Sequence, residues 1–501
     1  MGSSGRIAGR LAKTLAAAVT ALALVLVANT LRRGAPARPD VPPAPSDTSD
    51  PSLAVDHLAA AVRIPTVSHA TAAPDATSPG EDDESQFRAL VDLIERTYPK
   101  VHQTLTREVL GPRALLYTWT GTDPSLRPAL FAAHMDVVPV EEASASKWSH
   151  PPFDGTVEGG FVWGRGTLDD KGALVCLLEA AESLARDGYR PKRTIYLAFG
   201  GDEEVGGAQG AAKIVAALAG HDVHLDYVLD EGMSVTDGFF PGASGPIGIV
   251  GIAEKGYVSV ELVAESQAGH SSTPPATTAI GLLAEAIARL DANPMPARLD
   301  GPPRKLIEAL APEMPFSKRV AASNLWLLEP VVLSIMSREP AQNASIRTTM
   351  APTIIQGGVK DNVLPATARA VLNFRILPGD TVDQVVAHTT RVVADDRVHV
   401  KKLDETATEP SPVASTDSRA FHLLDRAIRQ IFPVATVAPT LVLGATDGRR
   451  YEKIAGGVYH FTPFVMRPED IQRVHGIDER MSVDDVRRGV RFYKLLLRDG
   501  E

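Results

Sequence analysis

Histidine and carboxylate side chains recur at five places along the chain, each directly after a short apolar stretch or in the loop that follows one. The five groups are His134-Met135-Asp136, Asp169-Asp170, Asp202-Glu203-Glu204, Asp230-Glu231 and the segment His475–Glu479. Open α/β sheets bind ligands beyond the carboxyl ends of their strands, so we expect these groups to meet at one sheet edge. So many carboxylates in a partly dry cleft would repel each other unless cations lay among them. The pattern therefore predicts a metal site.

The residue types indicate which metals would fit. Imidazole nitrogen and carboxylate oxygen without sulfur favour zinc, with manganese or cobalt as substitutes. A carboxylate that is shared by two ions fits metals ~3.5–4 Å apart. Cys176 is the single cysteine of the chain, so neither a thiolate zinc site nor an intrachain disulfide can form. We therefore expect a metal site made of histidine and carboxylate only.

Two of the groups suggest roles beside metal binding. Asp136 lies two residues after His134 and so points to the same side of the strand end, where it could hold the orientation of that imidazole. Glu203 and Glu204 would diverge in a turn, so that one can bind metal while the other takes a proton from water. Singly, each group is usually a solvated surface feature, but the five together favour a site with chemistry.

The elements around these groups are helices that alternate with short apolar strands, from Leu53 to about Gly251. This alternation predicts a sheet that is covered by helices. The predicted strands are Ala129–Ala133, Thr194–Phe199 and Tyr227–Leu229, and the predicted helices are Ala173–Arg186 and Ala211–Leu218.

A second pattern begins near Ile252. Strands are expected at Val258–Val263, Thr353–Gly357, Ala368–Ile376 and Val398–Lys402, helices near Thr278–Asp291 and Val382–Ala394, and a loop at Pro294–Pro315. After Glu405, helices at Ser418–Ile431 and Val483–Leu497 and strands near Thr440–Leu443 and Val458–Phe461 would complete the first sheet. We therefore predict an α/β domain in two parts, 51–251 and 405–501, that is interrupted by a smaller α+β domain at 252–404.

The composition is that of a folded globular protein. The chain has 501 residues, of which 44% are hydrophobic and 22% charged, and this length allows two or more domains. Its net charge is −10, and no run of Lys or Arg after the N-terminal region is dense enough to follow a phosphate backbone. These features argue against a nucleic-acid partner.

The first 50 residues differ in kind from the rest. Arg6, Arg10 and Lys13 precede the uncharged run Leu15–Ala28, and a Pro/Ala/Ser-rich linker follows at Gly34–Pro51. This order is typical of a signal peptide. A membrane anchor through residues 15–31 fits as well, since no clear cleavage site follows, although the run is short for a span of ~20 residues. In both cases we expect the body of the protein to be exported, to the periplasmic or extracellular side.

Longer stretches around the five groups resemble a known family, the dinuclear-zinc aminoacylases, succinyl-diaminopimelate desuccinylases and carboxypeptidases. Within it they are most similar to the carboxypeptidase S-like, Gly-X carboxypeptidase branch. The matching stretches include Ala132–Val140, Trp148–Gly155, Gly164–Gly172, Gly201–Gly207, Gly269–Pro275, Asn362–Pro365, Gly444–Asp447 and His475–Glu479. The resemblance implies a zinc-dependent exopeptidase-like α/β domain with a central mixed sheet, interrupted by a smaller lid domain that could form a homodimer.

The resemblance also implies which residues hold two zinc ions. Asp169 would bridge both ions. His134 and Asp230 would complete one site, and Glu204 and His475 would complete the other. Glu203 would be the general base that deprotonates the attacking water and then hands the proton to the leaving amine. Asp136 would belong to the same catalytic group.

Residues of the predicted lid would complete the site. By resemblance, His270 stabilises the tetrahedral oxyanion, and in several relatives the neighbouring subunit supplies this histidine. Asn362 and Arg375 would bind the substrate carboxylate, for which a planar guanidinium offers a bidentate bond. Asn373 departs from the pattern, because many relatives have Asp there. Gly444 would lie beside the substrate.

The activity implied is hydrolysis of an amide bond in short peptides or N-acyl amino acids that carry a free carboxylate. Two alternatives are an aminopeptidase, which would require a free substrate amine, and a non-catalytic protein that binds peptides or amino acids. Retention of Glu203 argues against the second, because a binding protein has no need of that base.

Overall fold

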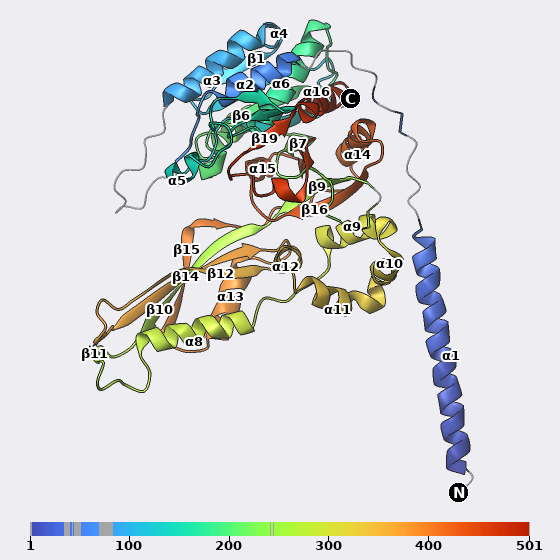
Figure 1. Ribbon diagram of the computed structural model, residues 1–501, viewed down its shortest axis with the longest axis vertical. Helices are drawn as coiled ribbons and strands as arrows, with labels where there is room; N and C mark the ends of the chain where they lie inside the picture. The colour runs from blue at the N-terminus through green and yellow to red at the C-terminus, as the bar shows by residue number, and fades with distance from the viewer. Residues whose placement is uncertain are drawn as a thin grey trace.

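A ten-stranded mixed sheet forms the larger part of the protein (Figure 1). The structure, a computed structural model, describes residues 3–34, 41–42, 44, 52–69, 84–240, 242–243 and 245–499. The strand order is β1-β2-β6-β3-β7-β17-β9-β8-β18, and β16 pairs with β9. The strands are β1 (Thr106–Val109), β2 (Ala114–Trp119), β3 (Ala129–His134), β6 (Ile195–Gly200), β7 (Tyr227–Asp230), β8 (Val235–Thr236), β9 (Ile247–Glu254), β16 (Thr436–Val442), β17 (Val458–His460) and β18 (Val465–Met466).

Helices cover both faces of this sheet because successive residues of a strand point to opposite sides. On β2, Leu115 and Tyr117 belong to the core under one helix layer, and Ala114 and Leu116 to the core under the other. The first layer contains α2 (Ser52–Val62), α3 (Glu84–Thr97), α4 (Pro99–Thr104), α6 (Lys171–Arg186), α14 (Arg419–Ile431) and α16 (Val483–Asp499), and the second contains α7 (Ala211–Gly220) and α15 (Gly448–Tyr451). The predicted α/β class with a central mixed sheet is confirmed.

Strands β3, β6 and β7 run parallel at the centre of the sheet, so that their carboxyl ends meet at one edge. A small sheet of β4 (Thr156–Glu158), β5 (Phe161–Trp163) and β19 (Arg480–Ser482) lies beside the loops that leave this edge, and α5 (Glu142–Ala145) precedes it. The short 3₁₀ turns are η1 (Glu203–Val205), η2 (Ala311–Glu313) and η3 (Pro468–Asp470).

A second, four-stranded antiparallel sheet has its own core and projects from the first (Figure 1). Its order is β12-β14-β10-β15, with β10 (Gly256–Glu265), β12 (Thr349–Gly357), β14 (Thr367–Ile376) and β15 (Val398–Thr408). Helices α8 (Ala279–Ala292) and α13 (Val382–Val393) pack on it, and β11 (Gly269–His270) pairs with β13 (Val363–Leu364) at its far tip. The chain passes from β9 of the large sheet to β10 of the small one within two residues, Glu254 and Gly256.

The segment that was predicted as a loop at Pro294–Pro315 contains a helix, which corrects that prediction. Helix α9 (Gly301–Leu310) begins with Pro302 and Pro303 in its first turn, where the N–H that proline lacks has no partner within the helix. Helices α10 (Phe316–Ser323), α11 (Leu325–Met336) and α12 (Pro340–Ile346) follow it.

Helix α1 (Ser3–Arg32) projects from the body as a single long rod (Figure 1). Within it, Arg10–Arg32 forms a stretch of 23 residues with a hydropathy of 2.2, long and apolar enough to cross a membrane. Most of the predicted linker Gly34–Pro51 lies outside the described residues.

Candidate metal centre

Side chains from five segments of the chain gather where β3, β6 and β7 end. His134 is the last residue of β3, Glu203 and Glu204 follow β6 in a 3₁₀ turn, and Asp169 lies just before α6. His475 comes from the loop that precedes β19. Three overlapping sets of potential ligands result: His134, Glu203 and Glu204; His134, Asp169 and Glu231; and Asp169, Glu204 and His475. In each set the ligand atoms lie within 4.8 Å of one another.

Asp169 lies between two imidazoles. Its Oδ1 is 2.7 Å from Nε2 of His134, and its Oδ2 is 2.9 Å from Nε2 of His475. Each carboxylate oxygen therefore faces a different histidine, which is the arrangement of a carboxylate that bridges two metal ions. Oε1 of Glu204 lies 3.3 Å from His475 Nε2 and is buried without a hydrogen bond among the described residues. A buried carboxylate oxygen in that state is a free ligand position.

Asp230, a predicted ligand, is not part of these three sets. Asp230 ends β7, and its Oδ2 accepts a hydrogen bond of 2.8 Å from Thr446 Oγ1. The next residue, Glu231, points to the other side and reaches His134 and Asp169. The sequence shows both acids side by side, and only the end point of the strand decides which one faces the histidines.

Asp136 holds both the histidine and the two glutamates in place. The Nδ1–H of His134 donates to the backbone carbonyl of Asp136 at 3.0 Å, which leaves Nε2 free to bind a metal. The buried carboxylate of Asp136 accepts from the backbone N–H groups of Glu203 and Glu204, at 3.1 and 3.2 Å. Asp136 therefore fixes the turn on which the predicted base and a predicted ligand lie.

A buried ion pair ties Asp169 to the loop of His475. Arg165 donates to Oε2 of Glu479 at 2.6 Å, and both side chains are almost fully buried. Oε1 of Glu479 accepts from the backbone N–H groups of Gly166, Leu168 and Asp169 at 3.0, 2.9 and 3.3 Å. The same guanidinium donates to the carbonyl of His475 at 3.1 Å. Both residues lie in stretches that resemble the family, but nothing in their spacing along the sequence indicates that they pair.

The electrostatics of the site favour a bound cation. Burial raises the pKa of Glu203 and of Glu231 well above the usual carboxyl value, and neighbouring carboxylates raise it further. The neighbouring carboxylates of Asp169 and Glu204 raise the pKa of His475 to about 10. This concentration of buried negative charge favours a cation, and the donor set of imidazole and carboxylate fits two divalent ions.

The predicted lid residues lie apart from this cluster. His270 and Asn362 belong to the β11–β13 tip of the second sheet, at the far end from the metal centre (Figure 1). Arg375 lies near the opposite end of β14, where its guanidinium stacks over the Tyr257 ring at 4.9 Å. Gly444 lies in the loop after β16, two residues before Thr446. The structure thus brings the Gly444 loop to the cluster but leaves His270 and Asn362 far from it in the same chain.

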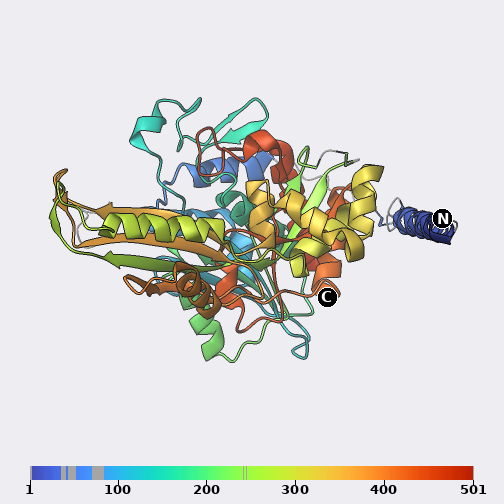
Figure 2. The same cartoon turned by 90° about the horizontal axis from the view of Figure 1, so that it is seen from below.

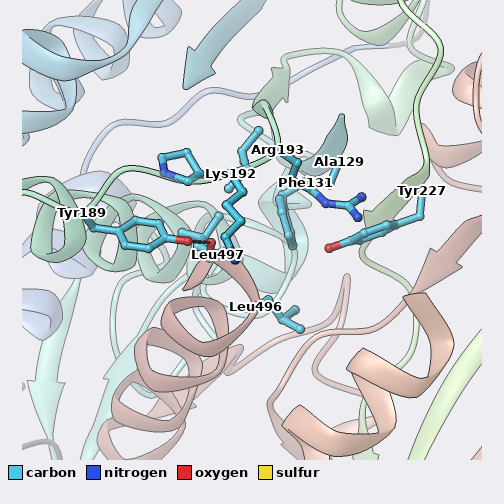
Figure 3. A pocket seen from close by; sticks show the side chains of 10 residues that line it. Ala129, Phe131, Tyr189, Lys192, Arg193, Tyr227, Leu496 and Leu497 are labelled. Carbon is cyan, nitrogen blue, oxygen red and sulfur yellow. Dashed lines mark hydrogen bonds between the residues drawn. The ribbon is translucent and has the colours of Figure 1, made fainter. Parts of the chain in front are cut away.

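A hollow at the other edge of the sheet has different chemistry (Figure 3). Ala129, Ile195 and Tyr227, the first residues of β3, β6 and β7, line it together with residues of the α16 end. The metal centre lies at the last residues of the same three strands. This hollow therefore has no access to the cluster.

Comparisons with known proteins agree with this geometry. A family model described as Peptidase family M20/M25/M40 matches residues 130–499. A probable carboxypeptidase S-like protein 2 of Dictyostelium discoideum is 41% identical over 84% of this chain and 82% of its own length. The human N-fatty-acyl-amino acid synthase/hydrolase PM20D1 is 38% identical over 89% and 87%. The crystal structure of an M20 family metallo-carboxypeptidase from Sulfolobus solfataricus shares the fold, with a TM-score of 0.63 and 17% identity over 89% of this chain and 98% of its own.

Replacing Glu479 by Gln is expected to weaken both the fold and metal binding. The change leaves Arg165 buried without its counter-charge, which costs about 3–5 kcal/mol of unfolding free energy. Loss of the support behind Asp169 should lower metal affinity by ~10–100-fold. Denaturant unfolding and titration against a chromophoric chelator measure the two effects.

The matched control, Asp484→Asn, removes an exposed ion pair with Arg487 and should cost less than about 1 kcal/mol of unfolding free energy. Unchanged metal affinity in Glu479→Gln would contradict the role of this pair.

Proposed function

The chain belongs to peptidase family M20/M25/M40, and we propose that it is a two-zinc hydrolase of N-acyl amino acids that carry a free carboxylate. Metal-dependent amide hydrolysis is the activity of the chain. The main support for two metal ions is the position of Asp169. Its carboxylate lies between Nε2 of His134 and Nε2 of His475, and Glu203 is close by. The relatives named carboxypeptidase S-like and N-fatty-acyl-amino acid synthase/hydrolase both support a substrate with an acylated amine and a free carboxylate.

His134, Asp169, Glu204, Glu231 and His475 would hold the metals, with Asp169 shared between the two. We replace Asp230 by Glu231 in this set because only Glu231 reaches His134 and Asp169. When bound, two divalent ions would polarise the amide carbonyl and lower the pKa of the attacking water. Zinc is the proposed ion because the donors are imidazole and carboxylate, and manganese or cobalt could replace it.

Glu203 would move the proton. Its carboxylate takes a proton from the attacking water and then passes it to the nitrogen of the leaving amine. Asp136 keeps this carboxylate at the metal centre through the N–H of Glu203. Burial raises the pKa of Glu203, which suits a group that must both take up and release a proton. A protein that only binds peptides would not need Glu203, because it has no proton to transfer.

Arg375 would bind the substrate carboxylate. Among the residues that the structure describes, no acidic side chain forms an ion pair with it, so its guanidinium is available to a carboxylate ligand. It lies on β14 opposite Tyr257, the second residue of β10, and thus close to where the chain leaves the large sheet. Asn373, at the position of an Asp in many relatives, lies 3.4 Å from Ser259 Oγ.

His270 and Asn362 would act on the metal centre of a second subunit. Arg375 lies eight residues along β14 from its first residue, Thr367, which is about 26 Å at ~3.3 Å per residue, and Asn362 lies before that end of the strand, so the two cannot reach one carboxylate in one chain. Oδ1 of Asn362 is buried without a hydrogen bond among the described residues. Strand β12 is the open edge of the second sheet and exposes Ile354 and Ile355. We propose that two such edges pair in a two-fold dimer.

We propose that α1 directs the chain out of the cytoplasm, to the periplasmic or extracellular side. The stretch Arg10–Arg32 is long enough to cross a membrane. The uncharged run Leu15–Ala28, considered alone, is too short for that. The intact mass of the exported chain decides between a removed signal peptide and a retained anchor.

The purified protein is expected to hydrolyse N-acyl amino acids, to lose activity in a chelator and to regain it with zinc. In Glu203→Gln, kcat should fall by ~10²–10⁴-fold while two zinc ions remain bound, because Glu203 moves a proton and is not a ligand. Glu142→Gln, on exposed helix α5, is the control and should behave as the unchanged protein. Full activity of Glu203→Gln would disprove the mechanism. A requirement for a free substrate amine would indicate an aminopeptidase instead.

The assignment of Glu231 is tested by metal content. Glu231→Gln should reduce the bound zinc from two ions toward one, because it removes a charged ligand beside His134. Asp230→Asn should keep two ions, since an amide oxygen can still accept the hydrogen bond from Thr446. Elemental analysis of the dialysed proteins gives the stoichiometry. The reverse order of losses would restore Asp230 to the ligand set.

The shared site predicts complementation between two inactive variants. His270→Ala and Glu203→Gln should each be inactive alone, whereas co-expression should restore about a quarter of the activity, because half of the dimers then contain one intact site. Co-expressed Glu203→Gln and His134→Ala serve as the control, since both changes lie in one half of the site. If the first mixture stays as inactive as the control, the two subunits do not share a site.

A further inference from the structure

Helix α11 is apolar on almost its whole circumference, yet it is hardly buried. Its sequence is Leu-Trp-Leu-Leu-Glu-Pro-Val-Val-Leu-Ser-Ile-Met, and Leu325 is its only buried residue. A helix that faces water normally carries a polar face. The single charged residue of α11, Glu329, is paired with Arg304 at 2.6 Å. Something other than water is expected to cover this helix.

Exposed apolar side chains gather on α11 and at the start of α10. Leu327, Val331 and Ile335 follow each other at intervals of four residues and so share one face of α11, where 40%, 52% and 55% of each side chain is exposed. Trp326 lies beside them with 63% exposed. Phe316, at the start of α10, is 52% exposed. Contiguous apolar patches of this kind mark a protein or membrane contact.

Helix α1 indicates which of the two it is. Nδ2 of Asn29 donates to Oδ1 of Asn324 at 2.9 Å, and Nδ2 of Asn324 donates to the carbonyl of Leu26 at 3.1 Å. Asn324 joins α10 to α11 and is fully buried, as is Thr30 of α1. The stretch of the chain with the length of a membrane span is therefore fastened to the junction of α10 and α11.

The direction of the helices agrees with a common surface. In the view from below, α1 is seen nearly end-on beside the yellow helices, and the second sheet with its helices faces the same side (Figure 2). Helices α10 and α11 meet at an angle of 117°, so the pair is bent too sharply to cross a bilayer as one rod. A bent apolar pair of this kind fits into one leaflet.

The chemistry at the rim of the patch also fits lipid. Lys318, two residues after Phe316, and Arg338, two residues after α11, are exposed, and long basic side chains of this kind can reach anionic headgroups. Tryptophan is the residue that membrane interfaces favour, and Trp326 lies in this position.

We propose that the patch Phe316, Trp326, Leu327, Val331 and Ile335 is a membrane-binding surface that enters the outer half of the bilayer beside α1. It is independent of the hydrolytic chemistry. Contact of this patch with lipid would hold the catalytic body against the membrane surface.

Fluorescence of Trp326 tests this surface in the full-length chain. The protein is reconstituted into vesicles of phosphatidylcholine and phosphatidylglycerol with or without bromine on the acyl chains, and Trp326→Phe is measured in parallel. The difference between the two proteins isolates Trp326 from Trp119, Trp148 and Trp163, which lie in the catalytic body. We expect brominated lipid to quench most of this difference signal and aqueous acrylamide to quench little of it.

Charge on the patch should lift it from the lipid. In Val331→Lys combined with Ile335→Lys, quenching of Trp326 by brominated lipid should largely disappear, while the matched variant Val109→Lys, at an exposed strand of the catalytic body, should keep it. Quenching of Trp326 by acrylamide but not by lipid overturns the proposal. Protection from both quenchers also overturns it and indicates a second protein on α11. Failure of the full-length chain to float with vesicles contradicts both the surface and the anchor.

Discussion

Negative charge in a small, dry space is the constraint on which the rest of the structure depends. Asp169, Glu203, Glu204 and Glu231 converge on two histidines at the edge of the sheet, and burial alone would force protons onto several of them. Divalent metal ions would relieve this conflict, because each ion can be bound by several carboxylate and imidazole groups at once. In the proposed mechanism, Glu203 is the acid that stays outside the ligand set.

The support behind the ligands follows from the same constraint. A carboxylate bridge is useful only if both of its oxygens keep their direction, and the chain secures Asp169 by its own backbone through Glu479. Arg165 neutralises Glu479 and holds the carbonyl of His475, so one buried pair positions ligands that lie 306 residues apart. On the other side, Asp136 orients His134 and the Glu203–Glu204 turn. Buried polar groups on two sides thus hold the side chains of the cluster in place.

The sequence was a good guide wherever the chemistry is local. His134, Asp169, Glu204 and His475 could be found because apolar strands with short polar loops must present those loops at one sheet edge. The resemblance implies Asp230 as a ligand, and the neighbouring Glu231 lies close to His134 and Asp169 in the structure. No sequence pattern tells which of two adjacent acids faces the histidines, because one residue reverses the direction of a side chain. Helix α9 was missed because two prolines suggest a loop, although both fit the first turn of a helix. The distance between His270 and the metals depends on how two domains are joined, which local spacing does not contain.

The order of these residues along the chain has a consequence for folding. Asp169 lies just before α6, while His475 and Glu479 lie just before β19 and α16, and α16 packs directly against α6. Asp169 therefore meets His475, and gains its support from Glu479, only when residues 475–499 have docked on the rest of the large domain. The cluster is thus completed by the folding of the whole domain and not by either part of it alone.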